Sequence, residues 1–146
     1  MRGRQSPRGE LVPSVFTRII NGERPGRFVY RDDEVVAFLT IAPINPGHTL
    51  VVPRREIDLW TDLPPELTAR LFQTAQQVAR AIHRAFRPRR VAALVVGLEV
   101  PHVHVHLIPF NSEAELRFDR ADHFVAPAAL DDAARRITAA FADAER

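Results

Sequence analysis

The sequence predicts an α+β domain built on a mainly antiparallel sheet. Three observations support this fold class: β-rich runs fill the first third of the chain, one long amphipathic helix pattern follows, and β-rich runs then return. Strands that are grouped, and do not alternate with helices, are typical of an antiparallel sheet with helices packed on it. The 146 residues, 46% of them hydrophobic, suffice for one core. We therefore expect a single domain over residues 14–146, preceded by a flexible leader over residues 1–13.

The first half of the domain predicts one short helix and three strands. Residues 14–23 (SVFTRIINGE) place apolar side chains at helical spacing and end in Asn-Gly, a common helix stop. Residues 27–30 (RFVY) and 34–39 (EVVAFL) are β-rich runs separated by Asp-Asp, which predicts a hairpin. Residues 48–53 (HTLVVP) follow the breaker stretch APINPG and predict the third strand.

The second half predicts a long helix, two strands and a terminal helix. Over residues 64–86 apolar side chains recur every three or four positions, with Asp62 as the expected N-cap and prolines in the first turn. Residues 91–100 (VAALVVGLEV) and 102–110 (HVHVHLIPF) predict two further strands. Apolar spacing over residues 130–141 predicts the terminal helix.

Composition excludes several classes of protein. No apolar run approaches the roughly 18 residues of a membrane span, and the N-terminus lacks the apolar middle of a signal peptide, so we expect a cytoplasmic protein. Cysteine is absent, which excludes disulfides and thiolate metal ligands. The formal net charge of +2 is small, and no basic stripe studded with aromatic residues accompanies it. Nucleic acid is therefore not an expected partner.

The stretch PHVHVHLIPF (101–110) carries three of the chain's six histidines at alternate positions. Side chains alternate between the two faces of a strand, so His102, His104 and His106 are expected to share one face, and the intervening apolar residues the other. The apolar face can pack on the long helix. The imidazole face then needs a polar partner.

The histidine row has three possible interpretations. A solvated row explains one or two histidines but gives no reason for three. A His-x-His pair can bind zinc, but at about 3.3 Å per residue the backbones of His102 and His106 lie roughly 13 Å apart, so a metal site would use two of the three and a distant ligand. A phosphate ester can lie along the row. Because neutral imidazole is a nucleophile near its ordinary pKa of about 6.5, the middle histidine could attack phosphorus while a neighbour assists the leaving group.

This stretch resembles the signature of the histidine triad (HIT) superfamily, His-φ-His-φ-His-φ-φ with φ apolar. INPGHTLVVPRR (44–55) resembles the family's second block, in which a Pro-Gly-His turn supplies a fourth histidine, here His48. Upstream, VFTRIINGERP and VVAFLTIAP resemble the Hint-like N-terminal segment and the strand that lines the nucleoside pocket. The resemblance covers roughly residues 14–110. It implies a HIT-like antiparallel sheet, one long central helix, a C-terminal helix, and a homodimer formed through the long helix and an edge strand.

The resemblance also implies a role for each histidine. His104 would be the nucleophile that forms a nucleotidyl-histidine intermediate on the α-phosphate, and His106 would contact the phosphate and the leaving group. His102 would pair with His48 and the backbone to orient the row. No metal and no cofactor is implied for this chemistry.

Further positions match the binding pocket of the family. Backbone amides around Glu99 and Val100 match those that hold phosphate oxygens, where fixed N–H donors stabilise developing charge. Four residues match positions that wrap the base, although ordinary core packing explains them equally well: Phe16, Ile19, Phe38 and Ile41.

The sequence departs from the family pattern at several positions. Thr40 stands where many relatives carry an aspartate that binds both ribose hydroxyls, and Leu98 replaces a common glutamine near the phosphates. Ser14 and Thr17 fall where zinc-binding bacterial relatives have Cys-x-x-Cys, so no structural zinc is expected. The segment from Asn111 onward has no assigned role, and its charged residues are expected to be solvated.

The expected function is hydrolysis of a nucleoside phosphoramidate with release of a nucleoside monophosphate, acting on a purine nucleotide or nucleotide conjugate. A dinucleoside polyphosphate hydrolase or phosphorylase is the alternative among enzymes. Thr40 and Leu98 also leave open a nucleotide-binding module without turnover, and the histidine row leaves open a metal-binding protein.

Overall fold

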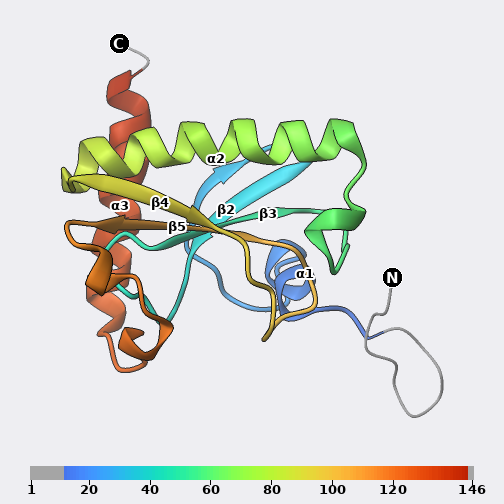
Figure 1. Cartoon of the computed structure of the whole chain (residues 1–146), viewed down its shortest axis with the longest axis horizontal. Coiled ribbons are helices and arrows are strands. Elements are labelled where there is room, and N and C mark those ends of the chain that lie inside the picture. Colours follow the sequence, from blue (N-terminus) through green and yellow to red (C-terminus); the bar gives the residue numbers. More distant parts are fainter. Residues whose placement is uncertain (1–11, 145–146) are drawn as a thin grey trace.

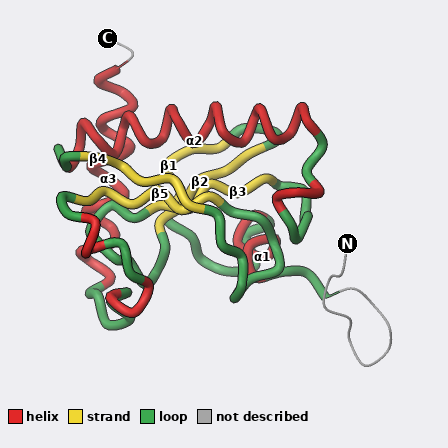
Figure 2. Tube along the Cα trace, in the orientation of Figure 1, coloured by secondary structure: helices red, strands yellow, loops and turns green. Residues whose placement is uncertain are grey.

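The computed structural model describes residues 12–144, so nearly all of the expected leader lies outside the described residues. The described chain contains three α-helices and five strands (Figures 1 and 2). Three short 3-10 turns lie between them, over Trp60–Asp62, Glu113–Glu115 and Phe118–Arg120. The main elements in chain order are α1 (Val15–Ile20), β1 (Phe28–Arg31), β2 (Val35–Leu39), β3 (Thr49–Pro53), α2 (Pro65–Phe86), β4 (Arg90–Leu94), β5 (Val105–Phe110) and α3 (Pro127–Ala144).

The five strands form one antiparallel sheet in the order β1-β2-β3-β5-β4. Ala37 of β2 pairs with Val51 of β3, and Val51 in turn pairs with Val105 of β5. The α+β class and the antiparallel sheet are therefore confirmed. No helix in the described part of the chain has both the length and the apolar character needed to cross a membrane.

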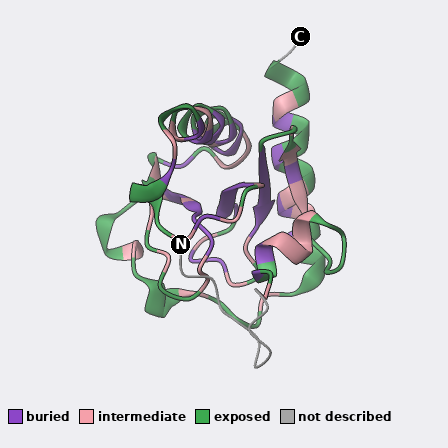
Figure 3. Ribbon diagram, turned by 90° about the vertical axis from the view of Figure 1, so that its right-hand side faces the viewer, coloured by how far each residue is buried: buried purple, intermediate pink, exposed green. Residues whose placement is uncertain are grey.

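The main core lies between the sheet and α2, which runs along one face of it (Figure 1). Figure 3 shows the buried side of α2 turned towards the sheet, with α3 standing beside it. Leu71 and Val78 of α2 are fully buried in the same apolar cluster as Val51, Val105 and Leu107. The apolar side of the histidine run thus packs beneath the long helix, as its alternation predicts.

A second, smaller apolar cluster covers the opposite face of the sheet, where α1 lies. Alternation along β2 divides its side chains between the two clusters: Val35 and Ala37 face α2, whereas Val36 and Phe38 face α1. Phe16 of α1 joins Phe38 in this second cluster. The face that carries the histidines is therefore partly walled by aromatic side chains.

Two expectations about element boundaries are wrong. Asp62 ends a 3-10 turn and does not cap α2, whose N-cap is Pro64 without a side-chain hydrogen bond. Two consecutive prolines fix the backbone of this turn, which allows the helix to begin without a polar cap.

The two C-terminal strands are also shorter than predicted. β4 ends at Leu94 and β5 begins at Val105, so His102 lies in a bend, where its amide donates to the carbonyl of Val100 at 2.8 Å, and His104 immediately precedes the strand. Gly97, with φ of 78°, turns the chain away after β4. The backbone of this segment finds a different partner, because the amide of Val103 donates to the carbonyl of Ile57 at 2.7 Å.

Candidate active site

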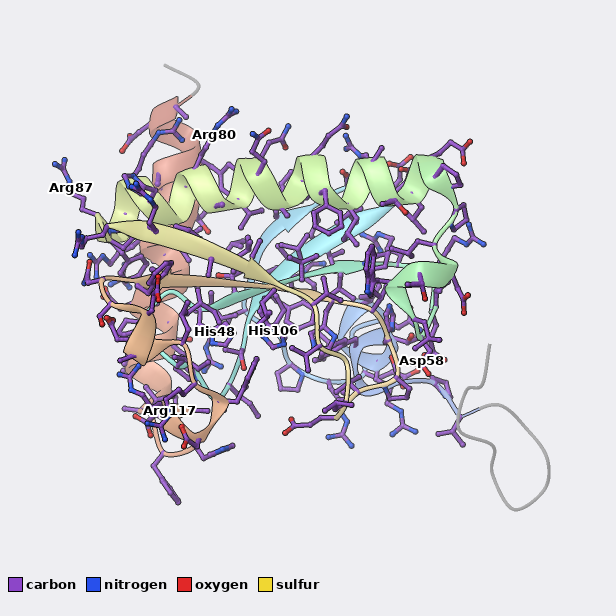
Figure 4. The ribbon with its side chains drawn as sticks, viewed as in Figure 1. His48, Asp58, Arg80, Arg87, His106 and Arg117 are labelled. Atoms are coloured by element: carbon purple, nitrogen blue, oxygen red, sulfur yellow. The ribbon has the colours of Figure 1, made fainter. Side chains whose placement is uncertain are left out.

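The structure brings the four predicted histidines together on the α1 side of the sheet. His106 lies in β5 opposite Leu50 of β3, and His48 lies two residues before Leu50, so the two imidazoles are diagonal neighbours across the ladder. Figure 4 shows His48 and His106 side by side below the sheet. The rings of His104 and His106 are 4.8 Å apart between centroids.

Hydrogen bonds determine which nitrogen of His106 carries a proton. The amide of Ile44 donates to His48 Nδ1 at 3.0 Å, which leaves the proton of a neutral His48 on Nε2. That Nε2 lies 2.9 Å from His106 Nδ1 and donates to it. The remaining proton of His106 therefore sits on Nε2. His48 pairs with His106 and not with His102, so the expected His48–His102 pairing is wrong; the β3–β5 register decides it.

His104 has the complementary arrangement. Its Nδ1 lies 2.8 Å from the carbonyl oxygen of His102, and a carbonyl can only accept, so Nδ1 carries the proton. Nε2 of the neutral ring then holds a free lone pair. The ring of Phe16 meets that of His104 edge-on, at 4.8 Å between centroids. His104 is therefore fixed as a neutral base or nucleophile through Nε2.

His102 is fully buried and ties α1 to the sheet. Its Nε2–H donates to the carbonyl of Pro53 at 2.7 Å, and the Ser14 hydroxyl, the N-cap of α1, donates to its Nδ1 at 2.7 Å. Glu56 accepts hydrogen bonds from the Ser14 amide at 2.5 Å and from the Thr17 hydroxyl at 2.8 Å. This network of Ser14, Thr17 and Glu56 orients the first histidine, and sequence reasoning did not find it.

Burial keeps the four imidazoles neutral. Desolvation is the main cause of a lowered pKa for all four histidines. Together with the charged forms of neighbouring histidines, it lowers the pKa of His48 to about 3 and that of His106 to about 4. At neutral pH the cluster therefore presents lone pairs and N–H donors, not cations.

The lowered pKa of His48 predicts loss of stability in mild acid. The unfolded chain binds a proton at His48 below its ordinary pKa of 6.5, whereas the folded chain binds it only near pH 3. The free energy of unfolding therefore falls as the pH drops below 6.5, by about 2 kcal/mol from this residue at pH 5. Urea unfolding at pH 7 and pH 5 measures the fall, which should be smaller by about this amount in His48→Asn. An equal fall in both proteins would contradict the assignment.

The predicted base-binding residues are only partly assembled. Phe16 and Phe38 meet edge-on at 5.5 Å between centroids, and Ile19 packs against the same cluster. Ile41 is 75% exposed and lies outside this cluster. The hydroxyl of Thr40 accepts a hydrogen bond from the amide of Ala42 at 3.2 Å, which leaves its own proton for another acceptor.

The predicted phosphate-binding segment borders an open pocket next to α1. Glu99 and Val100 line it together with Ser14, Arg18 and Arg24. The carboxylate of Glu99 is near enough to oppose the lowering of the His104 pKa. Leu98 is 91% exposed, so the side chain that replaces the family's glutamine makes no buried contact here.

An aromatic residue that the sequence did not indicate also reaches the histidines. Phe118, in the 3-10 turn after β5, meets His106 edge-on at 5.0 Å between centroids. Phe118 lies twelve positions beyond His106, in a segment without a recognisable motif.

The charged residues next to Phe118 are exposed, as expected. Arg117, which is paired with Asp119, and His123 are both exposed, and Arg117 projects from the molecule in Figure 4.

These features define a class of α+β proteins in which alternate histidines of one chain segment line an aromatic-walled site. The model of the HIT domain family matches residues 21–113, and the chain therefore belongs to the HIT family. An uncharacterised HIT-like protein of Methanocaldococcus jannaschii is 36% identical over 99 residues, which cover 65% of this chain and 77% of the relative.

Solved structures and two curated relatives extend this comparison. A hypothetical histidine triad nucleotide-binding protein of Sulfolobus tokodaii superimposes with a TM-score of 0.79 at 26% identity, covering 90% of this chain and 93% of the other. A bis(5'-nucleosyl)-tetraphosphatase of Schizosaccharomyces pombe is 36% identical, covering 55% of this chain and 47% of its own. An adenylylsulfatase of Arabidopsis thaliana is 30% identical, covering 65% and 51% respectively.

One of the structural relatives is a zinc-bound protein. A zinc-bound histidine triad protein of Mycobacterium smegmatis superimposes with a TM-score of 0.78 at 28% identity, covering 90% of this chain and 94% of the other. In the present chain the hydroxyls of Ser14 and Thr17 already donate to His102 and Glu56, and neutral hydroxyls are poor zinc ligands. Within residues 12–144, no three His, Cys, Asp or Glu side chains form a group that could hold a metal ion.

Proposed function

We propose that this protein hydrolyses nucleoside phosphoramidates, releasing the nucleoside monophosphate and an amine through a nucleotidyl-His104 intermediate. The observation that carries the proposal is the opposite tautomers of two adjacent imidazoles: a lone pair on His104 Nε2 and a proton on His106 Nε2. Such a pair provides a nucleophile and a donor for the leaving group. The named activities of the tetraphosphatase and adenylylsulfatase relatives support a nucleotide substrate.

In the first step, the lone pair of His104 Nε2 attacks the α-phosphorus and the P–N bond of the leaving amine breaks. The negative charge of the bound phosphate favours uptake of one proton by the His48–His106 pair, at His48 Nδ1 in place of the bond from Ile44. His106 then gives its Nε2 proton to the departing nitrogen and takes the His48 Nε2 proton on its own Nδ1. The products of this step are a neutral amine and a nucleotide bonded to His104. The purine base would rest against Phe16 and Phe38, and amides near Glu99 and Val100 would hold the phosphate oxygens.

In the second step, water attacks the same phosphorus and the bond to His104 Nε2 breaks. His106, now neutral, accepts the proton of the water, so the nucleoside monophosphate leaves and both histidines return to their starting states. The hydrogen bond between His48 Nε2 and His106 Nδ1 holds the His106 ring in position throughout.

The test is a side-by-side assay of the purified protein in EDTA with adenosine 5'-phosphoramidate, diadenosine tetraphosphate and adenylyl sulfate. The proposal expects the phosphoramidate to show the highest kcat/KM and a quenched reaction to contain a protein adduct heavier by one AMP. A preference for the tetraphosphate would favour the activity of the S. pombe relative. Tight nucleotide binding without turnover of any of the three would favour a binding module.

We also propose that two copies of the chain pair through β4. β4 is an edge strand, and an edge presents unpaired backbone donors and acceptors. Leu94 at its end and Val96 just beyond are about 40% exposed, at 39% and 43%. At the other edge, α3 packs against β1. Sedimentation equilibrium should give twice the monomer mass for the wild type and a monomer for a variant with Ala93→Pro, which removes a backbone donor at the free edge of β4. A monomeric wild type would refute this pairing.

A further inference from the structure

The segment that follows β5 is fixed to the loop that carries His48. The carboxylate of Glu115 accepts hydrogen bonds from the Ser112 amide at 2.8 Å and from the Asn45 side chain at 3.1 Å. Further along, the amide of Asp122 donates to the carbonyl of Pro43 at 2.9 Å. Asn45 and Pro43 lie just before His48 in the chain. Phe118 lies between these two anchor points, so its position beside the histidines is set by specific contacts.

Four aromatic rings form a continuous series through the site. Phe16 contacts His104 at 4.8 Å, His104 contacts His106 at 4.8 Å, and His106 contacts Phe118 at 5.0 Å between centroids. Phe16 is 6% exposed and belongs to the apolar cluster under α1, whereas Phe118 is 45% exposed. Phe118 therefore stands at the His106 end of the series with much of its ring free for a further contact.

The geometry of displacement at phosphorus gives the two ends of this series of rings different roles. The attacking and leaving atoms lie on opposite sides of the phosphorus, so a leaving group displaced by His104 departs on the side of its proton donor, His106. The ring beyond His106 on that side is Phe118. An aromatic ring on the leaving group can stack on the face of Phe118 or meet its edge, and such a contact increases affinity several-fold.

We infer that Phe118 is a specificity-determining residue that selects substrates whose leaving group carries an aromatic ring. This inference rests on the proposed function, because it takes the His106 end of the site to be the leaving-group end. It narrows the substrate class from nucleoside phosphoramidates in general to conjugates of nucleotides with amines that carry an aromatic ring.

The experiment measures binding in the His104→Ala background, so that no turnover is needed. The ligands are the N-benzyl and N-methyl amides of AMP, which differ in the aromatic ring of the leaving group. With Phe118 present, the benzyl conjugate should bind about five- to tenfold more tightly than the methyl conjugate by calorimetry. Phe118→Ala should reduce this ratio to about one, and Phe118→Trp should retain it.

Phe124 provides the matched control, because it lies in the same segment and is 96% exposed. Phe124→Ala should leave the ratio of the two dissociation constants unchanged. An unchanged ratio in Phe118→Ala, an equal loss for both ligands, or no binding of either would overturn the inference. Hydrolysis of the methyl conjugate by the wild type is measured separately: a selective but inactive protein refutes the proposed hydrolysis and leaves the ring selectivity standing.

Discussion

Replacing His104 by alanine should lower AMP release from adenosine 5'-phosphoramidate by about 10⁴-fold or more, because removal of a nucleophile abolishes the covalent route. Nε2 of this residue is the atom whose lone pair is left free by the bond from Nδ1–H to the His102 carbonyl. His106 cannot replace His104 as the nucleophile, because its Nε2 carries the proton. Freeing that lone pair would require reversing the chain of hydrogen bonds from Ile44 through His48. Steady-state assays in EDTA measure the effect.

Three controls make this result specific. His106→Asn should cost about 10²- to 10⁴-fold, the usual contribution of a proton donor, and should not abolish the AMP adduct on the protein. His83→Ala removes an exposed histidine of α2 and should leave turnover unchanged. Calorimetry should show that His104→Ala still binds AMP. Retention of more than a few per cent of the wild-type rate in His104→Ala would refute the nucleophile assignment.

Replacing Gly47 by alanine should lower the free energy of unfolding by about 3 kcal/mol, since two penalties coincide there. Gly47 has φ of 95°, a left-handed conformation that costs about 1–2 kcal/mol for a residue with a Cβ. The new Cβ would also lie 2.8 Å from a ring carbon of Phe86, which is well inside van der Waals contact. Because His48 is the next residue, the hydrogen bond to His106 should weaken and turnover should fall as well.

Gly22 and Phe86 allow the two penalties to be separated. Gly22 has φ of 81° and nothing within 4 Å of a built Cβ, so Gly22→Ala should show the conformational cost alone, about 1–2 kcal/mol. In a Phe86→Leu background the ring is absent, and Gly47→Ala should then cost about as little as Gly22→Ala. Denaturant unfolding of the four variants measures these values. An equal cost of Gly47→Ala in both backgrounds would show that the clash with Phe86 is absorbed.

Periodicity predicted the elements well but placed some of their ends incorrectly. The helical spacing of α2 reflects burial of one face, and the sequence displays that directly. β2 is buried on both faces, and its continuous apolar run is typical of such a strand. β5 was predicted three residues too long, because His102 lies in a bend and neither His102 nor His104 pairs with β4. A segment joins a sheet only where a partner strand lies beside it. No strand of the described chain pairs with the residues between Gly97 and Val105.

The sequence by itself determined the α+β class, the gathering of alternate histidines on one side, and membership of the HIT family through PHVHVHLIP and the Pro-Gly-His turn. Only the tertiary structure decided how the imidazoles are paired. His48 lies 58 positions from its partner His106, and Ser14 lies 88 positions from His102. Such contacts follow from strand register and from the docking of α1, which no local pattern records. The same long-range packing sets the tautomers and lowers the pKa values, and it brings Phe118 to the site.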